Sequence, residues 1–203
     1  MKKSLVRATF GFSVHTGWAA MIAVAGPPKS PVILDRRRVE MMGNEPTNPR
    51  FVYHYAAESL ALPAAERFVR KAIEQSRDNA LVALEAAIAE LRKKDYDIVA
   101  SGILVGNRPL EAALPDILKS HSLIHTAEGE LFRVAVKRAS ERLKIPVTEI
   151  RARDLEPQAA KVLGISSAKV KERLDAIGRA AGRPWSKDQK TALLAALVAA
   201  SAA

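Results

Sequence analysis

The sequence predicts one α/β domain in which a mixed sheet is flanked by helices. Segments typical of strands and of helices alternate along the 203 residues. This order indicates right-handed crossover connections between the strands of a mixed sheet. Hydrophobic residues make up 48% of the chain, which is enough to bury a core, so a disordered or fibrous protein is excluded. The absence of cysteine excludes disulfides, thiol nucleophiles and cysteine-bound metal clusters.

The amino-terminal part is expected to form strands. Apolar residues 9–14 and 17–25 surround a turn at His15, and residues 31–42 begin with a β-branched run typical of another strand. The segment also has the outline of a secretory signal, but the polar residues Ser13, His15 and Thr16 interrupt its apolar run. We therefore expect strands, a cytoplasmic location and no membrane association, because no run reaches the length of a membrane span.

The remaining elements follow from periodicity and end signals. Pro63 suits the first position of a long helix over 63–94, whereas residues 51–62 are ambiguous. A continuous apolar run then predicts a buried parallel strand over 97–105, followed by helices over 110–119 and 122–143 with an interruption near residue 120. Another strand is expected over 145–151, a short helix over 167–178, and a last helix that a capping box opens at residue 186. We expect residues 1–155 to form the α/β core and residues 156–203 a basic helical segment packed on it.

The charge of the chain favours a polyanionic partner. Its net charge is +10, and residues 159–203 carry eight Lys or Arg against three acids. Nucleic acid, DNA or RNA, is the first expectation, and simple solubility is the alternative. The candidate phosphate contacts are Lys169, Lys171, Arg173, Arg179, Arg183, Lys187 and Lys190. Trp185 either stacks on a base or packs against the last helix. The basic run at 36–38 either contacts phosphate or is a solvated edge strand.

His121, His125 and Glu128 form the clearest candidate for metal chemistry. On a continuous helix the three share one face, which would offer two nitrogens and one carboxylate to a divalent metal ion. The alternative is a helix that begins later, with Thr126 as its cap and Glu128 in its first turn. Neither a phosphate-binding Walker loop nor a Gly-x-Ser-x-Gly nucleophile motif occurs, which argues against a nucleotide hydrolase or a serine esterase.

A family resemblance appears in the second half of the chain. Ala127 and Gly129 lead a helix that is followed by the short apolar strand at 145–150. A Val-Lys pair at Lys171, a Gly-Arg pair at Gly178 and the Ser186-Lys-Asp-Gln start of a helix then follow in order. This order resembles RuvC-type Holliday-junction resolvases of the ribonuclease H-like superfamily. The opening residues, Gly-Phe-Ser and Thr-Gly-Trp over a strand, turn and strand, are compatible with it.

The departures from that family shape the functional hypothesis. Family enzymes cut phosphodiesters with Mg²⁺ held by carboxylates. The resemblance implies such carboxylates on the opening strand, at the end of the middle strand and, as a pair, after the capping-box start of the last helix. This chain has Ser13, then the segment 105–107 (Val-Gly-Asn), and an Ala-Leu-rich run at those places. Either the chemistry is rebuilt from Ser13, His15 and the His121–Glu128 group, or the scaffold binds without cutting.

The leading hypothesis is therefore a nucleic-acid-binding protein on a non-cleaving ribonuclease H-like scaffold. Three alternatives remain from the sequence. One is a metal-dependent hydrolase or nuclease that uses the histidines and Glu128. Another is a translation-associated domain similar to those of release factors. The third is a structural partner that forms a homodimer through its apolar carboxyl-terminal helix.

Overall fold

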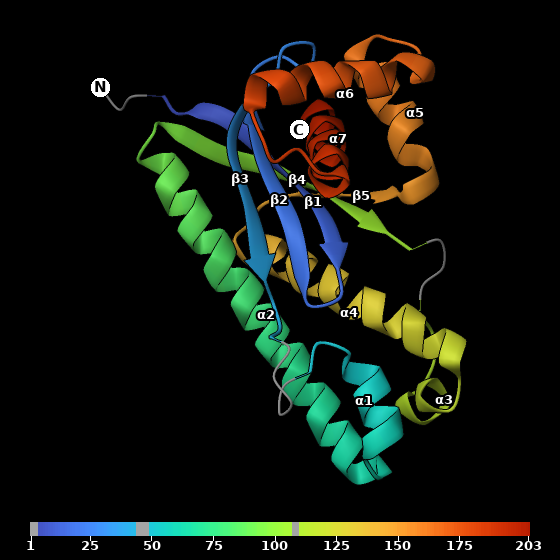
Figure 1. Ribbon diagram of the computed structural model, residues 1–203. Helices are drawn as coiled ribbons and strands as arrows, with labels where there is room; N and C mark the ends of the chain where they lie inside the picture. The colour runs from blue at the N-terminus through green and yellow to red at the C-terminus, as the bar shows by residue number, and fades with distance from the viewer. Residues whose placement is uncertain (1–3, 44–48, 107–109) are drawn as a thin grey trace.

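A five-stranded mixed sheet forms the centre of the computed structural model, which describes residues 4–43, 49–106 and 110–203. The strand order is β3-β2-β1-β4-β5 (Figure 1). The first three strands are antiparallel neighbours: β1 (Val6–His15), β2 (Trp18–Ala25) and β3 (Val32–Glu40). On the other side of β1, β4 (Tyr96–Val105) pairs in parallel with β1 and β5 (Val147–Arg151) in parallel with β4. β1 is thus the central strand.

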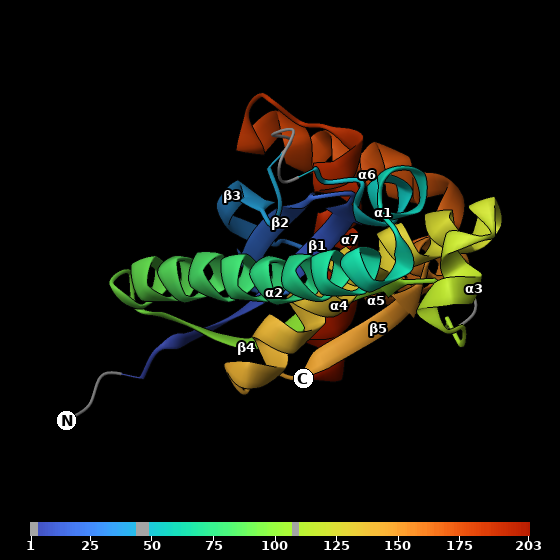
Figure 2. The same cartoon turned by 90° about the horizontal axis from the view of Figure 1, so that it is seen from below.

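One face of the sheet is covered by two long helices. These are α2 (Leu62–Arg92) and α4 (His121–Arg142), whose buried residues join β1, β2 and β3 in one hydrophobic core. Figure 2 shows the length of α2, which passes from α1 (Val52–Ser59) at one end to the start of β4 at the other. Both α1 and the short α3 (Leu114–Leu118) lie beyond the ends of β1 and β2, beside α4 (Figure 1).

The opposite face carries the three helices at the end of the chain. A second core joins β2 and β5 to α5 (Ala152–Leu163), α6 (Ser167–Ala181) and α7 (Lys187–Ala202). The helix α7 lies directly on β1, β4 and β2, with every residue from Ala192 to Ala199 buried. A homodimer would have to use another surface, because the apolar side chains of α7 are already buried within this chain.

Two glycines allow α7 to approach the sheet closely. A Cβ added to Gly11 of β1 would lie 2.0 Å from the carbonyl oxygen of Ala192. A Cβ added to Gly102 of β4 would lie 2.1 Å from that of Ala195. Side chains at these two neighbouring positions would therefore push the helix away, so the lack of a side chain at both sets the distance between the two layers.

The sequence-based elements are largely confirmed, with one ambiguity resolved and two corrections. The ambiguous segment 51–62 contains the helix α1, because Val52, Tyr53 and Ala56 bury one helical face. The helix expected over 110–119 is reduced to α3, in which Pro115 occupies the first turn. The helix α5 was not expected, and the boundary proposed between residues 155 and 156 falls inside it. No helix in the described part of the chain combines the length and apolar character needed to cross a membrane.

Candidate functional site

The carboxyl end of the central strand β1 brings Ser13 and His15 to the first turn of α7. His15 Nε2 lies 2.9 Å from Asp188 Oδ1 and 3.5 Å from Ser13 Oγ. Asp188 reaches this place because Ser186 opens α7 with the expected capping box, in which its hydroxyl accepts from Gln189 N. Both contacts use the same ring nitrogen of His15, so the three side chains do not form a Ser-His-Asp relay, which needs one contact at each nitrogen.

An aromatic and cationic stack adjoins His15. The imidazole is stacked on Trp18 of β2, with 4.4 Å between ring centroids and 15° between ring planes. The guanidinium of Arg38 lies 3.8 Å from the Trp18 ring and is paired with Glu40 at the end of β3. At the carboxyl end of β1, His15 therefore lies between the ring of Trp18 and the carboxylate of Asp188.

The structure shows which residues lie where the family resemblance implies carboxylates. Ser13 is buried near the end of β1, and Val105 ends β4. The Ala-Leu-rich run of α7 is buried against the sheet. Asn107 lies outside the described residues. Asp188, one turn before that run, is the carboxylate that contacts His15. From the sequence it was one of the three acids of the basic segment and part of the Ser186-Lys-Asp-Gln helix start, with no functional role.

The structure divides the seven candidate phosphate contacts into two groups. Five are exposed on α6, on the segment that follows it and at the start of α7: Lys169, Lys171, Arg179, Arg183 and Lys187. The other two contact groups within the chain. Arg173 donates to the carbonyl of Lys29, and Lys190 donates to Asp175 at 2.6 Å, which holds the pKa of that carboxyl below its usual value. Trp185 packs over Gly178, and its indole N–H donates to the Leu174 carbonyl at 3.0 Å.

The basic run of β3 alternates between the two faces of the sheet, as its spacing predicts. Arg36 donates to the carbonyls of Ala181, Gly182 and Pro184, where α6 ends. On the opposite face Arg37 pairs with Asp35 and with Glu90 of α2, and its hydrogen bond lowers the pKa of Glu90. Two of the three arginines thus hold helices against the edge strand of the sheet.

Replacing Arg36 by Ala is expected to lower the free energy of unfolding by about 1–3 kcal/mol, because three carbonyls at the end of α6 lose their charged donor. The matched control is Arg38→Ala on the same strand. Arg38 is exposed, so that variant should change stability by about 1 kcal/mol or less. Urea unfolding of both variants tests the difference, and equal losses would contradict the role given to Arg36.

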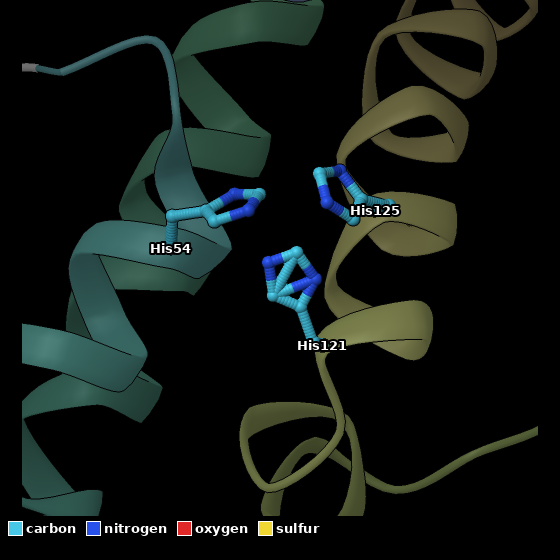
Figure 3. A group of neighbouring side chains, drawn as sticks. All are labelled: His54, His121 and His125. Carbon is cyan, nitrogen blue, oxygen red and sulfur yellow. The ribbon is translucent and has the colours of Figure 1, made fainter.

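Three of the four histidines meet between α1 and α4. His54, from the segment that the sequence left ambiguous, points toward His121 and His125 (Figure 3). One ligand nitrogen from each of the three rings lies within 4.8 Å of those of the other two. His54 is half-buried, and both His121 and His125 are exposed. His15 is not a member of this group and instead contacts Asp188.

Glu128 lies beside the histidine cluster and contacts the α1 side of it. Its Oε1 accepts from the backbone N–H of Tyr53 at 2.7 Å and of His54 at 3.1 Å, and lies 3.2 Å from His54 Nδ1. Burial raises the pKa of Glu128, although the hydrogen bonds from His54 and Tyr53 oppose that shift. Burial, with the charge of Glu128 as a smaller cause, raises the pKa of Tyr53 to about 12.

The structure brings His54 beside the expected ligand group. The helix α4 begins at His121 and is continuous, so His121, His125 and Glu128 do share a face, and Glu128 is not in the first turn. Thr126 does not cap the helix, because its hydroxyl donates to the Ser122 carbonyl one turn earlier. Glu128 contacts the ring of His54, a residue outside the group expected from the sequence.

The sheet order and the two helical layers define a ribonuclease H-like α/β fold. No protein-family model matches the chain, and a search of curated proteins also found no match. Two solved structures of RuvC from Thermus thermophilus are similar to it. The one in complex with a Holliday junction substrate matches with a TM-score of 0.56 and 13% identity over 94% of this chain and 91% of that one. Another RuvC structure matches with a TM-score of 0.52 and 14% identity over 94% and 92%. The likeness confirms the fold class expected from the sequence.

Proposed function

We propose that this protein binds structured nucleic acid through its carboxyl-terminal helices and does not cut it by the two-metal route. The observation that carries the proposal is a resolvase-like scaffold over 94% of the chain whose central strand bears Ser13 and His15. The similar RuvC structure is a complex with a Holliday junction, so a four-way DNA junction is the first partner to test.

Binding is supported by the exposed cations of α6 and the start of α7. These two helices lie on the same face of the sheet. The exposed cations that they and the segment between them carry are Lys169, Lys171, Arg179, Arg183 and Lys187. Such side chains neutralise phosphates, and they position a nucleic acid without reading its sequence. Arg173, Lys190 and Trp185 are left out of the proposed contacts because each is engaged within the chain.

The proposed lack of cleavage rests on the chemistry at the end of β1. Two-metal cleavage needs hard oxygen ligands around Mg²⁺, and a carboxylate supplies them with negative charge. Ser13 offers a neutral hydroxyl that is buried and lies 3.5 Å from an imidazole. Asp188 is the carboxylate in contact with His15, and His15 and Asp188 are not a cage for two cations.

The first test compares binding of the purified protein to duplex DNA, a four-way junction, single-stranded DNA and structured RNA at two salt concentrations. We expect affinity to fall steeply with salt. A variant with Gln at the five exposed positions should bind at least about tenfold more weakly, with a shallower salt dependence, because each lost phosphate contact lowers the slope by about one.

The matched control removes the same charge from the opposite face of the sheet. It carries Gln at five exposed positions of α2 and the segment after it: Arg67, Arg70, Lys71, Lys93 and Lys94. This control should keep most of the affinity. Equal losses in both variants would show that net charge alone drives binding, and affinity that does not change with salt would overturn the proposal.

Cleavage is tested on the same substrates with Mg²⁺ or Mn²⁺ and a gel that separates the products. We expect intact nucleic acid. Metal-dependent products that persist when the protein is purified by two independent routes would show that the protein cuts without a carboxylate at position 13. Binding restricted to structured RNA would instead favour the translation-associated alternative.

A further inference from the structure

The histidine cluster joins two elements that are far apart in the sequence. His54 comes from α1, whereas His121 and His125 lie one turn apart on α4 (Figure 3). The ring centroids are separated by 4.4 Å for His121 and His125, 4.8 Å for His54 and His125, and 5.7 Å for His54 and His121. All three rings therefore face one small volume between the two helices.

The donor set of this cluster selects a particular class of metal ion. Three imidazole nitrogens suit Zn²⁺ and neighbouring transition metals, whereas Mg²⁺ and Ca²⁺ prefer oxygen ligands. Ligand nitrogens about 2.1 Å from zinc at tetrahedral angles lie roughly 3.4 Å from one another. The nitrogens of the cluster lie within 4.8 Å, so small ring rotations by exposed side chains bring them to that spacing.

Glu128 favours the tautomer of His54 that suits a metal ligand. Its Oε1 lies 3.2 Å from Nδ1 of His54, so a proton on Nδ1 is held by the carboxylate and the lone pair of Nε2 is left for an ion. The two backbone donors from Tyr53 and His54 hold the same oxygen in place. A carboxylate behind a histidine is the arrangement that orients many zinc ligands, and its negative charge favours a cation on the other side of the ring.

We propose that His54, His121 and His125 form a binding site for a divalent transition-metal ion of the zinc class, with Glu128 as the positioning residue. Two of the three ligands are exposed, so the fourth coordination position faces solvent and takes water. The bound ion would tie α1 to α4. This site is independent of the proposed nucleic-acid contacts, which lie on α6 and α7.

The test uses full-length protein without a histidine tag, stripped with a chelator and then titrated with Zn²⁺ against a chromophoric competitor. We expect one tight equivalent per chain and a higher melting temperature with zinc. Co²⁺ in place of Zn²⁺ should give the visible absorption of a four- or five-coordinate nitrogen site. A large excess of Mg²⁺ should not compete.

Single substitutions separate the three ligands from the remaining histidine. His54→Ala, His121→Ala and His125→Ala should each weaken zinc binding by about 100-fold or more, because two imidazoles are a poor zinc site. His15→Ala removes the fourth histidine and should bind zinc like the unmodified chain. Circular dichroism and melting of each metal-free variant establish that it is folded.

Glu128→Gln tests the positioning role, because the amide oxygen can still accept from the backbone while the charge is lost. We expect zinc affinity to fall about 10–100-fold while the Co²⁺ spectrum of the saturated protein keeps its shape. A merely structural role would leave the affinity unchanged. The proposal is overturned if the unmodified chain binds no stoichiometric zinc, or if His15→Ala lowers the affinity as much as the cluster variants do.

Discussion

The Gly11→Ala variant is expected to lose about 3 kcal/mol or more of unfolding free energy. The new Cβ would lie 2.0 Å from the Ala192 carbonyl oxygen and 2.4 Å from the Ala196 nitrogen. Both are backbone atoms of α7, so no side-chain rotation relieves the contact. The helix or the central strand must move, which disturbs the core on that face. Urea unfolding measures the loss.

The control makes the same chemical change where the added methyl group has room. Gly129 lies inside α4, and the nearest atoms to its added Cβ belong to the flexible guanidinium of Arg133, 3.1 Å away. Gly129→Ala should therefore stabilise the protein by about 0.5–1 kcal/mol through helix propensity.

Adding Gly102→Ala to Gly11→Ala should cost less unfolding free energy than the sum of the two single changes, since both displace the same helix. Additive losses would mean that the two glycines do not act on one contact.

Phe132→Ala is expected to cost about 3–5 kcal/mol. Phe132 lies on α4 with 0% of its surface exposed, in the core between α4, α2 and the sheet, so the lost ring leaves a cavity. The same substitution at Phe51, which is 45% exposed, should cost about 1 kcal/mol or less. Thermal and urea unfolding of the two variants provide the comparison. A similar cost at both positions would show that the effect does not come from burial.

Most of the fold could be predicted because its pattern is local. Apolar runs on either side of a turn identified β1 and β2, a β-branched run identified β3, and a continuous apolar run identified β4. Pro63 and the capping box at Ser186 marked the starts of two helices. The helix α5 escaped because Pro157 lies inside it and interrupts the helical signal. The segment 51–62 begins with Phe, Val and Tyr, which favour strands, and only the burial of its apolar face against neighbouring helices makes it helical.

The candidate sites were harder to predict because they combine distant segments. Spacing placed His121, His125 and Glu128 on one face, which the continuous helix α4 confirms. It could not show that His54 lies across from them, because that requires the packing of α1 on α4. Asp188 likewise reaches His15 across 173 positions of sequence through the docking of α7. Ser13, at a place where the resemblance implies a carboxylate, could be noted from the sequence because that needed only the identity of one residue.

The position of α7 in the chain has a consequence for synthesis on the ribosome. The central strand β1 is the first described element to be made and α7 is the last, yet they pack directly on each other. Until α7 emerges, the part of the sheet that it covers stays exposed, and such exposed surface makes a folding intermediate prone to aggregation. Packing on this face of the sheet is therefore completed only after α7 has been translated, and chaperones that shield apolar strands would have their greatest influence before that point.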